Sequence, residues 1–302
     1  MKKLITLCLG LVFLTSCEKE DIVPVSNQQI SVPPVVAFDP FAALPKETAI
    51  PDSNFEKVLI EMGIDKILDG KVTTLDVQYK TDLVIKDSKG IQSLKGIESF
   101  ISLTKLIVHH QKIKEIDVTK NINLQTLHLW DHPLTQIDIT KNTKLQSLVL
   151  SAVNIEYADL SNNKDLIEID YSNGDLSQYG ATRGFKSIDV SKNTKLIRLW
   201  FGRNRFTELD VSMCPNLTDV WIHDNPQLTS FKYIPTSKLI MFAAWNTGLE
   251  SIDLKGAYPL AIHVYDNEKL KTVKVSSLRW LNDAIARNSV AYTKDVHTQW
   301  AE

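Results

Sequence analysis

Cysteine is scarce in this sequence, and its few residues do not suggest a disulfide framework. Cys8 lies in an N-terminal segment that we expect to be removed, and Cys17 has a separate fate described below. Because Cys214 is then left alone, we expect a fold that does not depend on disulfides. Its position in Ser-Met-Cys-Pro, at a chain corner, favours a small buried structural thiol over a reactive one.

An excess of charge of one sign is also lacking. The 34 Lys and Arg against 36 Asp and Glu give a formal net charge of −2, and losing Lys2 and Lys3 with the N-terminal segment makes it −4. A nucleic-acid partner would require a basic face, so we exclude that class of partner. A hydrophobic content of 43% with 23% charged residues is typical of a globular chain and not of a disordered one.

The short motifs that mark common active sites are missing. The sequence has no His-Glu-x-x-His, no Gly-x-Ser-x-Gly, no phosphate-binding loop and no paired-cysteine metal motif. His109 and His110 are adjacent, so on a strand they point to opposite faces and cannot chelate one ion together. Asp219 and His223 flank Trp221 and can hold a polar group, but nothing else beside them indicates catalysis. We predict a protein that is not an enzyme and needs no metal or cofactor.

The N-terminus has the pattern of an export signal. Lys2 and Lys3 precede an apolar run, 4–14, that is too short to span a bilayer. The following Leu-Thr-Ser-Cys, 14–17, resembles the lipobox of bacterial lipoproteins. That resemblance implies removal of residues 1–16 and acylation of Cys17, which would anchor the chain firmly in a membrane. The alternative is an ordinary secretory signal with a chance cysteine.

A tether is expected to follow the anchor. The acidic tetrapeptide 18–21, Glu-Lys-Glu-Asp, resembles the surface-export signal of Bacteroidetes lipoproteins, although it can also be solvated linker charge. Prolines recur along the segment that follows, to about residue 48, and they favour extended, semi-rigid backbone. We predict a lipidated tether over residues 17–48 and a protein at the outer membrane that faces the cell exterior. Its only membrane contact would be the lipid.

Internal repetition dominates the rest of the chain. Four copies are regular: IKEIDVTKNINLQTLHLWDHP from Ile113, LTQIDITKNTKLQSLVLSAVN from Leu134, FKSIDVSKNTKLIRLWFGRNR from Phe185 and FTELDVSMCPNLTDVWIHDNPQ from Phe206. Looser copies start at Ile91, Ile155, Leu228 and Leu249. The period is 21 or 22 residues, except for a longer copy over 155–184. Each copy contains L-x-x-L-x-L, the signature of leucine-rich repeats.

The signature predicts a β-rich leucine-rich-repeat solenoid. Alternation within L-x-L points the leucines into each coil, and stacked coils bury a continuous core. The first half of each copy, such as 116–118 or 188–190, also alternates, so we expect short convex strands opposite a concave parallel sheet. The repeats resemble the short-repeat solenoids of Bacteroidetes surface proteins, which are related in style to internalins. The resemblance covers roughly residues 50–275.

Caps are expected at both ends, because terminal coils would otherwise expose their core. We predict an N-terminal cap over 49–90 with a short helix at 55–62, repeats over 91–275, and a C-terminal cap over 276–302 with a helix at 277–288. The Ile-Pro-Asp-x-Asn-Phe-Glu sequence from Ile50 looks like the N-terminal cap of the same family. Trp280 and Trp300 are interpreted as packing in the C-terminal cap.

Two polar columns run through the repeats. Aspartate recurs at 117, 138, 159, 189, 210 and 253, and Lys-Asn recurs at 120–121, 141–142 and 192–193. A ladder of acids can bind calcium. The interpretation that we favour is that Asp, Ser and Asn satisfy backbone groups at the corners of the coils.

The candidate ligand surface is the outward face of the concave sheet. A first outward column holds the residue between the two strand leucines, a second holds the residue after them, and a third holds the residue before the first of them. Four of the six tryptophans fall on this surface, where large aromatic side chains require an explanation. The candidate ligand-binding residues are Trp130, Asp170, Tyr179, Arg198, Trp200, Asp219, Trp221, His223, Trp245, His263 and Tyr265. The alternative is a self-contained aromatic ladder that stabilises the sheet.

The long repeat adds residues next to this surface. Its extra segment, about 175–184, follows the concave strand just before the coil of Trp200, and insertions of this kind often lie on the binding face. Tyr179 and Arg183 would then stand beside the aromatic residues. A tolerated surface insertion is the alternative.

Two classes of ligand remain. A protein partner is favoured by the length of the solenoid, which offers far more area than a short glycan needs, and by analogy with internalin-like solenoids. A surface glycan is favoured by tryptophans concentrated without a large aliphatic surround. We predict a non-catalytic surface binding protein, an adhesin or a subunit of a surface complex, with glycan binding as the alternative.

Overall fold

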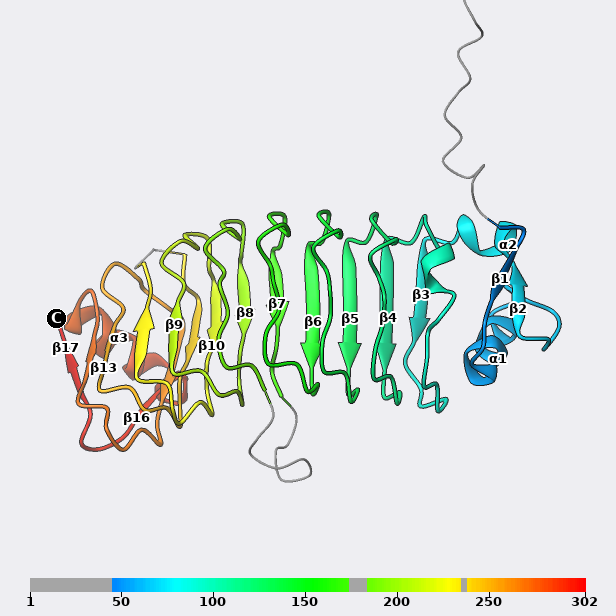
Figure 1. Ribbon diagram of the computed structural model, residues 1–302. Helices are drawn as coiled ribbons and strands as arrows, with labels where there is room; N and C mark the ends of the chain where they lie inside the picture. The colour runs from blue at the N-terminus through cyan, green and yellow to red at the C-terminus, as the bar shows by residue number, and fades with distance from the viewer. Residues whose placement is uncertain (1–44, 174–183, 235–237) are drawn as a thin grey trace, which may run out of the picture. The chain divides into compact units, whose positions relative to one another are not determined.

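The computed structural model describes residues 45–173, 184–234 and 238–302, and they form an elongated stack of coils (Figure 1). Ten parallel strands run in the order β16-β14-β12-β10-β8-β7-β6-β5-β4-β3 along one side. Their bounds are β3 Asp82–Ile85, β4 Lys105–His109, β5 Thr126–Trp130, β6 Ser147–Ser151, β7 Glu168–Asp170, β8 Arg198–Trp200, β10 Asp219–Trp221, β12 Met241–Ala243, β14 Ala261–Val264 and β16 Tyr292–Lys294. The predicted leucine-rich-repeat solenoid with a parallel sheet is confirmed.

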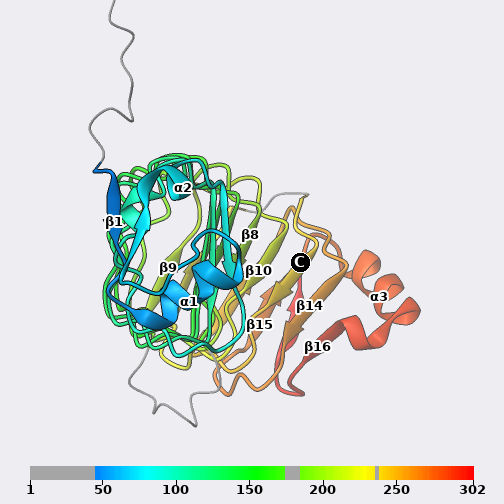
Figure 2. The ribbon, with the colours of Figure 1, turned by 90° about the vertical axis from the view of Figure 1, so that its right-hand side faces the viewer.

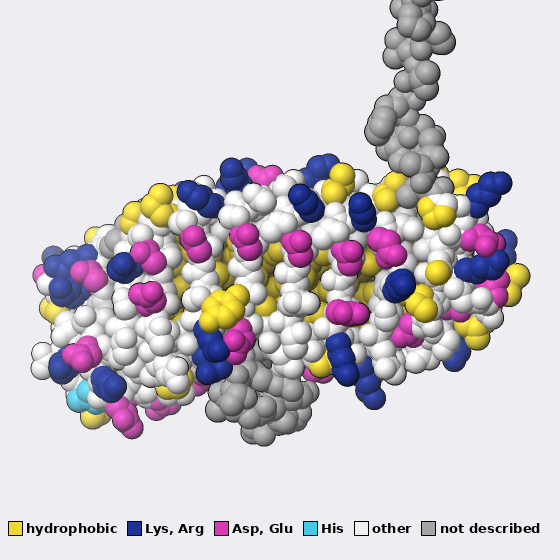
Figure 3. Space-filling model, viewed as in Figure 1, with side chains coloured by type: hydrophobic (Ala, Val, Ile, Leu, Met, Phe, Trp, Pro, Cys, Tyr) yellow, Lys and Arg dark blue, Asp and Glu magenta, His cyan; other side chains and the backbone are white. Residues whose placement is uncertain are grey.

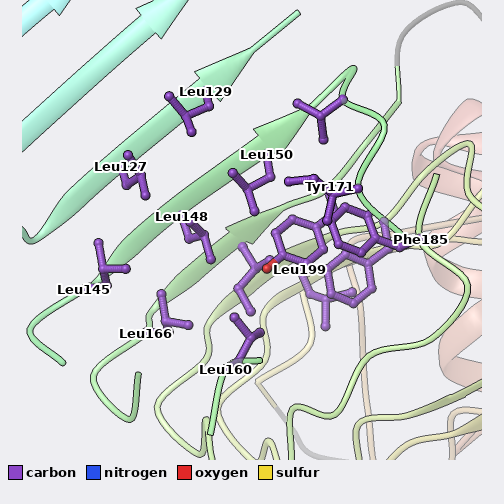
Figure 4. Close-up of a cluster of buried hydrophobic side chains, with 14 of the residues drawn as sticks. Leu127, Leu129, Leu145, Leu148, Leu150, Leu160, Leu166, Tyr171, Phe185 and Leu199 are labelled. Atoms are coloured by element: carbon purple, nitrogen blue, oxygen red, sulfur yellow. The ribbon is translucent and has the colours of Figure 1, made fainter. Parts of the chain in front are cut away.

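The core fills the inside of the stack as the L-x-x-L-x-L pattern predicts. In β5 the side chains of Leu127 and Leu129 point inward and are fully buried, while His128 between them faces outward. Strand pairing places Leu127 beside Leu148 of β6, so each column of leucines continues from coil to coil (Figure 4). Burial of each such side chain contributes about 1.5–3 kcal/mol.

Aromatic rings pack together in the core where the long repeat meets the next coil. The Tyr171 ring stacks on Phe185 at 4.0 Å between centroids and on Phe201 at 5.5 Å, and all three side chains are buried. Figure 4 shows the Tyr171 and Phe185 rings lying against each other. The larger rings occupy the core at the coil that carries the extra residues, so the stack continues across it.

Convex strands are present in the C-terminal half of the stack. β9 Glu208–Asp210 pairs with β11 Ser230–Lys232, and β13 Ser251–Asp253 pairs with β15 Thr272–Lys274, which pairs with β17 Gln299–Ala301. The corresponding segments of the earlier coils, 116–118 and 188–190, are not strands. The alternating pattern therefore buries one side of these segments in every coil, but only the later coils pair their backbones there.

Buried asparagines join the earlier coils at one corner. Asn163 donates from Nδ2 to the backbone oxygens of Ile139 and Asn142 at 3.0 and 2.9 Å, and Asn142 and Asn193 make the same bonds to their preceding coils. We call Asn121, Asn142, Asn163 and Asn193 the asparagine ladder. Cys214 occupies the next position, with its Sγ 3.7 Å from the oxygens of Val190 and Asn193. The thiol is buried and structural, as predicted.

The aspartate column lies at the start of the corner turns in which the asparagines of the ladder come last. Asp117 Oδ1 accepts hydrogen bonds from the backbone N–H of Thr119 at 2.9 Å and from its hydroxyl at 2.6 Å. Each of the other aspartates in the column accepts from the backbone N–H two residues on. The predicted corner role is confirmed, and Figure 3 shows acidic side chains in a regular row along one face. Among the described residues, no group of three or more His, Cys, Asp or Glu is placed to hold a metal ion.

The N-terminal cap combines two strands and two helices. β1 Glu47–Ala49 pairs antiparallel with β2 Lys71–Thr73, so paired backbone begins two residues before the expected boundary at 49. Helix α1 Ser53–Glu61 is capped by Asp52, whose other oxygen accepts from the N–H groups of Gln92 and Ser93 in the first repeat. Helix α2 Thr74–Gln78 and the 3-10 turn η1 Ile97–Ser99 complete this end.

The C-terminal cap contains the expected helix and also a further coil. Helix α3 Leu278–Arg287 starts at the N-cap Ser277 and buries Leu281 and Ala284. After the 3-10 turn η2 Ser289–Ala291, β16 joins the ten-stranded sheet and β17 joins the convex sheet. Trp280 and Trp300 pack against the core, as predicted for this cap. Figure 2 shows α3 standing outside the stacked coils.

The predicted signal and tether lie largely outside the described residues. Cys17 and segment 18–21 belong to residues 1–44, of which the structure describes nothing. Within the described part of the chain, no helix has both the length and the apolar character needed to cross a bilayer.

Candidate functional site

The outward side of the ten-stranded sheet, here called the sheet face, has the predicted columns in register. Pairing aligns Asp170 with Trp200, Trp200 with Trp221, and Trp221 with Ala243 in the first column. In the second column His109 aligns with Trp130, and Trp130 aligns with Ser151. The period-2 alternation of each strand and the parallel register together place the candidate residues that the structure describes on one face.

Four rings of the last coils form a C-terminal aromatic cluster: Trp221, His223, Trp245 and Tyr265. His223 stacks on Trp245 at 4.1 Å between centroids, and Trp245 stacks on Tyr265 at 5.4 Å with 4° between the planes. Trp221 meets Trp245 edge-on at 6.1 Å. All four side chains are partly exposed, so the rings contact one another and also reach solvent.

Gly202 gives the His223 ring its place in the cluster. A Cβ added at residue 202 would lie 2.4 Å from His223 Cε1, so the ring occupies the space of the missing side chain. Burial lowers the pKa of His223 below its ordinary value. His223 is therefore a neutral aromatic ring at pH 7 and stacks without adding positive charge.

Trp200 lies in register with Trp221, and a cationic side chain lies near its ring. The guanidinium carbon of Arg198 lies 6.0 Å from the Trp200 ring centroid. Arg198 also donates from Nε to Glu168 at 3.2 Å. The sheet face thus carries a compensated ion pair beside a partly exposed indole ring.

The remaining candidates are separated from this cluster or lie at its margin. Asp219 accepts a hydrogen bond from the Thr218 hydroxyl, and His263 Nδ1 lies 3.0 Å from Thr293 Oγ1. Trp130 is 42% exposed and contacts His109 and His110 at the other end of the sheet face. Tyr179 and Arg183 lie outside the described residues.

A hollow of about 380 Å³ opens on the sheet face between Trp130 and Asp170. We call it the sheet hollow. It is lined by His109, His128, Trp130, Val149, Ser151, Asp170, Ser172 and Asn173. Sequence reasoning selected Trp130 and Asp170 but not the other six. The available signal was side-chain size, because the second column falls from tryptophan to two serines and glycine before it rises to histidine.

Burial controls the charges of the sheet hollow. It lowers the pKa values of His109 and His128, so both rings are neutral at pH 7. It raises the pKa of Asp170, whose Oδ1 accepts the Ser172 backbone N–H at 2.8 Å. The site can therefore present an aromatic wall, neutral imidazoles and one half-buried carboxylate to a ligand.

The thiol of Cys214 takes no part in such chemistry. It is buried in the convex half of its coil, and burial raises its pKa to about 12. A thiol with this pKa stays protonated and is not a nucleophile at neutral pH.

Comparison with known proteins gives likeness in solved structures alone. No protein-family model matches the sequence, and no match was found among curated proteins. An internalin from Listeria monocytogenes is similar over 84% of this chain and 96% of its own, at 15% identity and a TM-score of 0.46. The leucine-rich-repeat domain of APL1B is similar over 82% and 75%, at 13% identity and 0.45. Internalin C2 of L. monocytogenes is similar over 62% and 91%, at 20% identity and 0.41.

Proposed function

We propose that this chain is a non-catalytic binding protein that holds a partner protein on its sheet face. The observation that carries the proposal is the C-terminal aromatic cluster, in which Trp221 and Trp245 stay partly exposed after they pack on their neighbours. Tryptophan, tyrosine and arginine are the usual anchors of protein interfaces. A sheet of ten strands also spans enough surface for an interface of ordinary size.

Site-specific photo-crosslinking of the full chain in the cells that make it tests this proposal. A photoreactive residue at Met241, in β12 beside the cluster, samples the sheet face, and one at Asp210 samples the convex face as a matched control. We expect an adduct of one defined mass from Met241 and none from Asp210. Equal adducts from both positions, or none from the sheet face, would contradict the proposal.

The double variant Trp200→Ala/Trp221→Ala is expected to abolish the adduct made from Met241. Its free energy of unfolding should change by less than about 1 kcal/mol, because both rings lie on the outside of the sheet. Urea unfolding of the purified variant measures this. A loss of several kcal/mol would instead assign the rings to the stability of the sheet.

A surface glycan is the alternative ligand, and partly exposed indole rings beside the carboxylates of Asp170 and Asp219 favour it. A glycan array probed with the full chain in detergent tests this alternative. A signal that Trp200→Ala/Trp221→Ala removes would replace the protein partner with a glycan.

We further propose that the chain is anchored in the outer membrane through acylated Cys17 and faces the cell exterior. The lipobox pattern and the acidic tetrapeptide 18–21 support this. Labelling with a palmitate analogue should mark the chain and not its Cys17→Ala variant. Protease added to intact cells should remove the anchored chain, and its protection would place the protein in the periplasm.

A further inference from the structure

The sheet hollow differs from the rest of the sheet face because small side chains form its floor. Ser151 and Ser172 follow Trp130 in the second column, and Val149 lies between His128 and Asp170 in the first. Large side chains therefore stand at one margin, and the carboxylate of Asp170 stands at the other. The side chains of the floor come from two neighbouring coils, those of β6 and β7.

The Trp130 ring forms one wall of the sheet hollow, and two histidine rings pack against it. The ring of His109 meets Trp130 edge-on at 5.3 Å, and that of His110 lies at 4.7 Å. His110 Nδ1 is itself fixed by Asp131 Oδ2 at 3.0 Å. An indole ring supported in this way loses little further conformational freedom when a ligand packs on it.

Among the residues that the structure describes, Asp170 has neutral hydrogen-bond partners and forms no ion pair. Its Oδ1 accepts the Ser172 N–H, whereas the neighbouring carboxylate, Glu168, is paired with Arg198. On the Trp130 side of the sheet hollow, His128 Nε2 lies 2.8 Å from the hydroxyl oxygen of Ser147. Among the described residues that line the sheet hollow there is no lysine or arginine. The half-buried carboxylate therefore has a desolvation cost that a cation from outside can offset.

We propose that the sheet hollow receives the side chain of a lysine or arginine of the partner protein. This inference rests on the proposed function. The aliphatic stem packs over Val149 and the Trp130 ring, and the charged end donates to the Asp170 carboxylate. The cation near the indole face and the charge-assisted hydrogen bond each favour the bound state. A fully apolar side chain would leave the carboxylate unpaired.

Ligand-observed NMR with the full chain in detergent tests the proposal directly. The probes are Nα-acetyl-lysine methylamide, its norleucine analogue, which lacks the ammonium group, and methyl glucoside. We expect the lysine probe to bind about tenfold more tightly than the norleucine probe, the ratio for one charge-assisted hydrogen bond. Equal affinities, or preferential binding of the sugar, would overturn the proposal.

Three variants locate the binding. Asp170→Asn keeps the shape and the acceptor for the Ser172 N–H and should weaken the lysine probe about tenfold. Trp130→Ala should weaken both amino-acid probes. Asp82→Asn, a carboxylate change in β3 at the far end of the sheet face, should leave the affinity within twofold. A melting temperature measured for each variant confirms folding, and an unchanged affinity in a folded Asp170→Asn variant would overturn the proposal.

The two proposals fail in different ways. If the photo-crosslink from Met241 forms but is unchanged by Asp170→Asn, and the lysine probe does not bind, the basic side chain is excluded and the proposed function stands. If no sheet-face crosslink forms, the proposed function fails whatever the probes do.

Discussion

At the scale of single residues, Tyr171 is a polar group buried where the repeat pattern places leucine. Its ring fills the core of the long coil between Phe185 and Phe201, and its hydroxyl is buried with no hydrogen-bond partner among the residues that the structure describes. Burial raises the pKa of this phenol well above its ordinary value. An unpaired buried hydroxyl costs about 1–3 kcal/mol.

Tyr171→Phe is therefore expected to raise the free energy of unfolding by about 1 kcal/mol, because it keeps the stacked ring and removes the unpaired group. Chemical denaturation of the two proteins measures the difference. Tyr265→Phe is the matched control, since the Tyr265 ring is partly exposed in the C-terminal aromatic cluster and its hydroxyl is not confined to the core. A destabilised Tyr171→Phe variant would show that the hydroxyl has a partner.

Residue-level prediction from sequence succeeded where a strict period controls the outcome. The outward columns were predicted in register because one-residue slips would bury His128 and expose Leu127. The contacts within the columns were not predictable in the same way. Whether His223 leans over Gly202, or Trp130 borders a hollow, depends on the relative sizes of neighbours in adjacent coils, and periodicity carries no such information.

At the scale of elements, two devices connect the coils in succession. The asparagine ladder runs from Asn121 to Asn193, and Cys214 occupies the same corner in the next coil. Convex strand pairing begins with β9, in the same coil as Cys214. Alternation in the sequence indicates that one side of a segment is buried, but not whether its backbone pairs with a neighbouring coil. The sequence therefore predicted convex strands in every coil, whereas only the later coils form them. The Lys-Asn column in the sequence indicated asparagines at this corner. Their hydrogen bonds to the preceding coil were not predictable from the sequence and are seen only in the structure.

Asn163→Ala is expected to lower the free energy of unfolding by about 2 kcal/mol, because the backbone oxygens of Ile139 and Asn142 lose their donor inside the stack. Asn162→Ala is the matched control. Asn162 is exposed and donates to the Thr140 oxygen at 3.2 Å, so its loss should cost less than about 0.5 kcal/mol. Urea titration of the purified variants measures both changes. Similar losses of unfolding free energy in the two variants would show that the asparagine ladder does not stabilise the fold.

At the scale of the whole molecule, the shifted pKa values act mostly in one direction. Burial lowers the pKa of five histidines from 6.5: His109, His128, His132, His223 and His263. Hydrogen bonds from neighbouring hydroxyl groups lower the pKa of five corner aspartates from 3.8: Asp117, Asp138, Asp159, Asp189 and Asp210. Each group binds a proton more weakly in the folded chain, so acidification favours unfolding. Asp170, with its raised pKa, acts in the opposite direction.

We expect the urea midpoint to fall in two stages, first as the pH drops below about 6.5 and again below about 3.8. His132→Gln should reduce the first stage. His132 is buried, with Nε2 2.8 Å from the Val108 oxygen, and glutamine already occupies the matching position, Gln111, one coil earlier. A midpoint that stays constant between about pH 7.5 and 5.5 would contradict a contribution from the histidines.

The even spacing of the first three residues of the asparagine ladder has a consequence for how such a chain can change its length. Asn121, Asn142 and Asn163 are each 21 residues apart, and every donor reaches back to the coil just before it. A coil removed or duplicated as a 21-residue unit inside this span would therefore leave each new junction with the same donors, acceptors and core columns. In-frame recombination between neighbouring repeats can lengthen or shorten the N-terminal half of the solenoid and leave both caps unaltered.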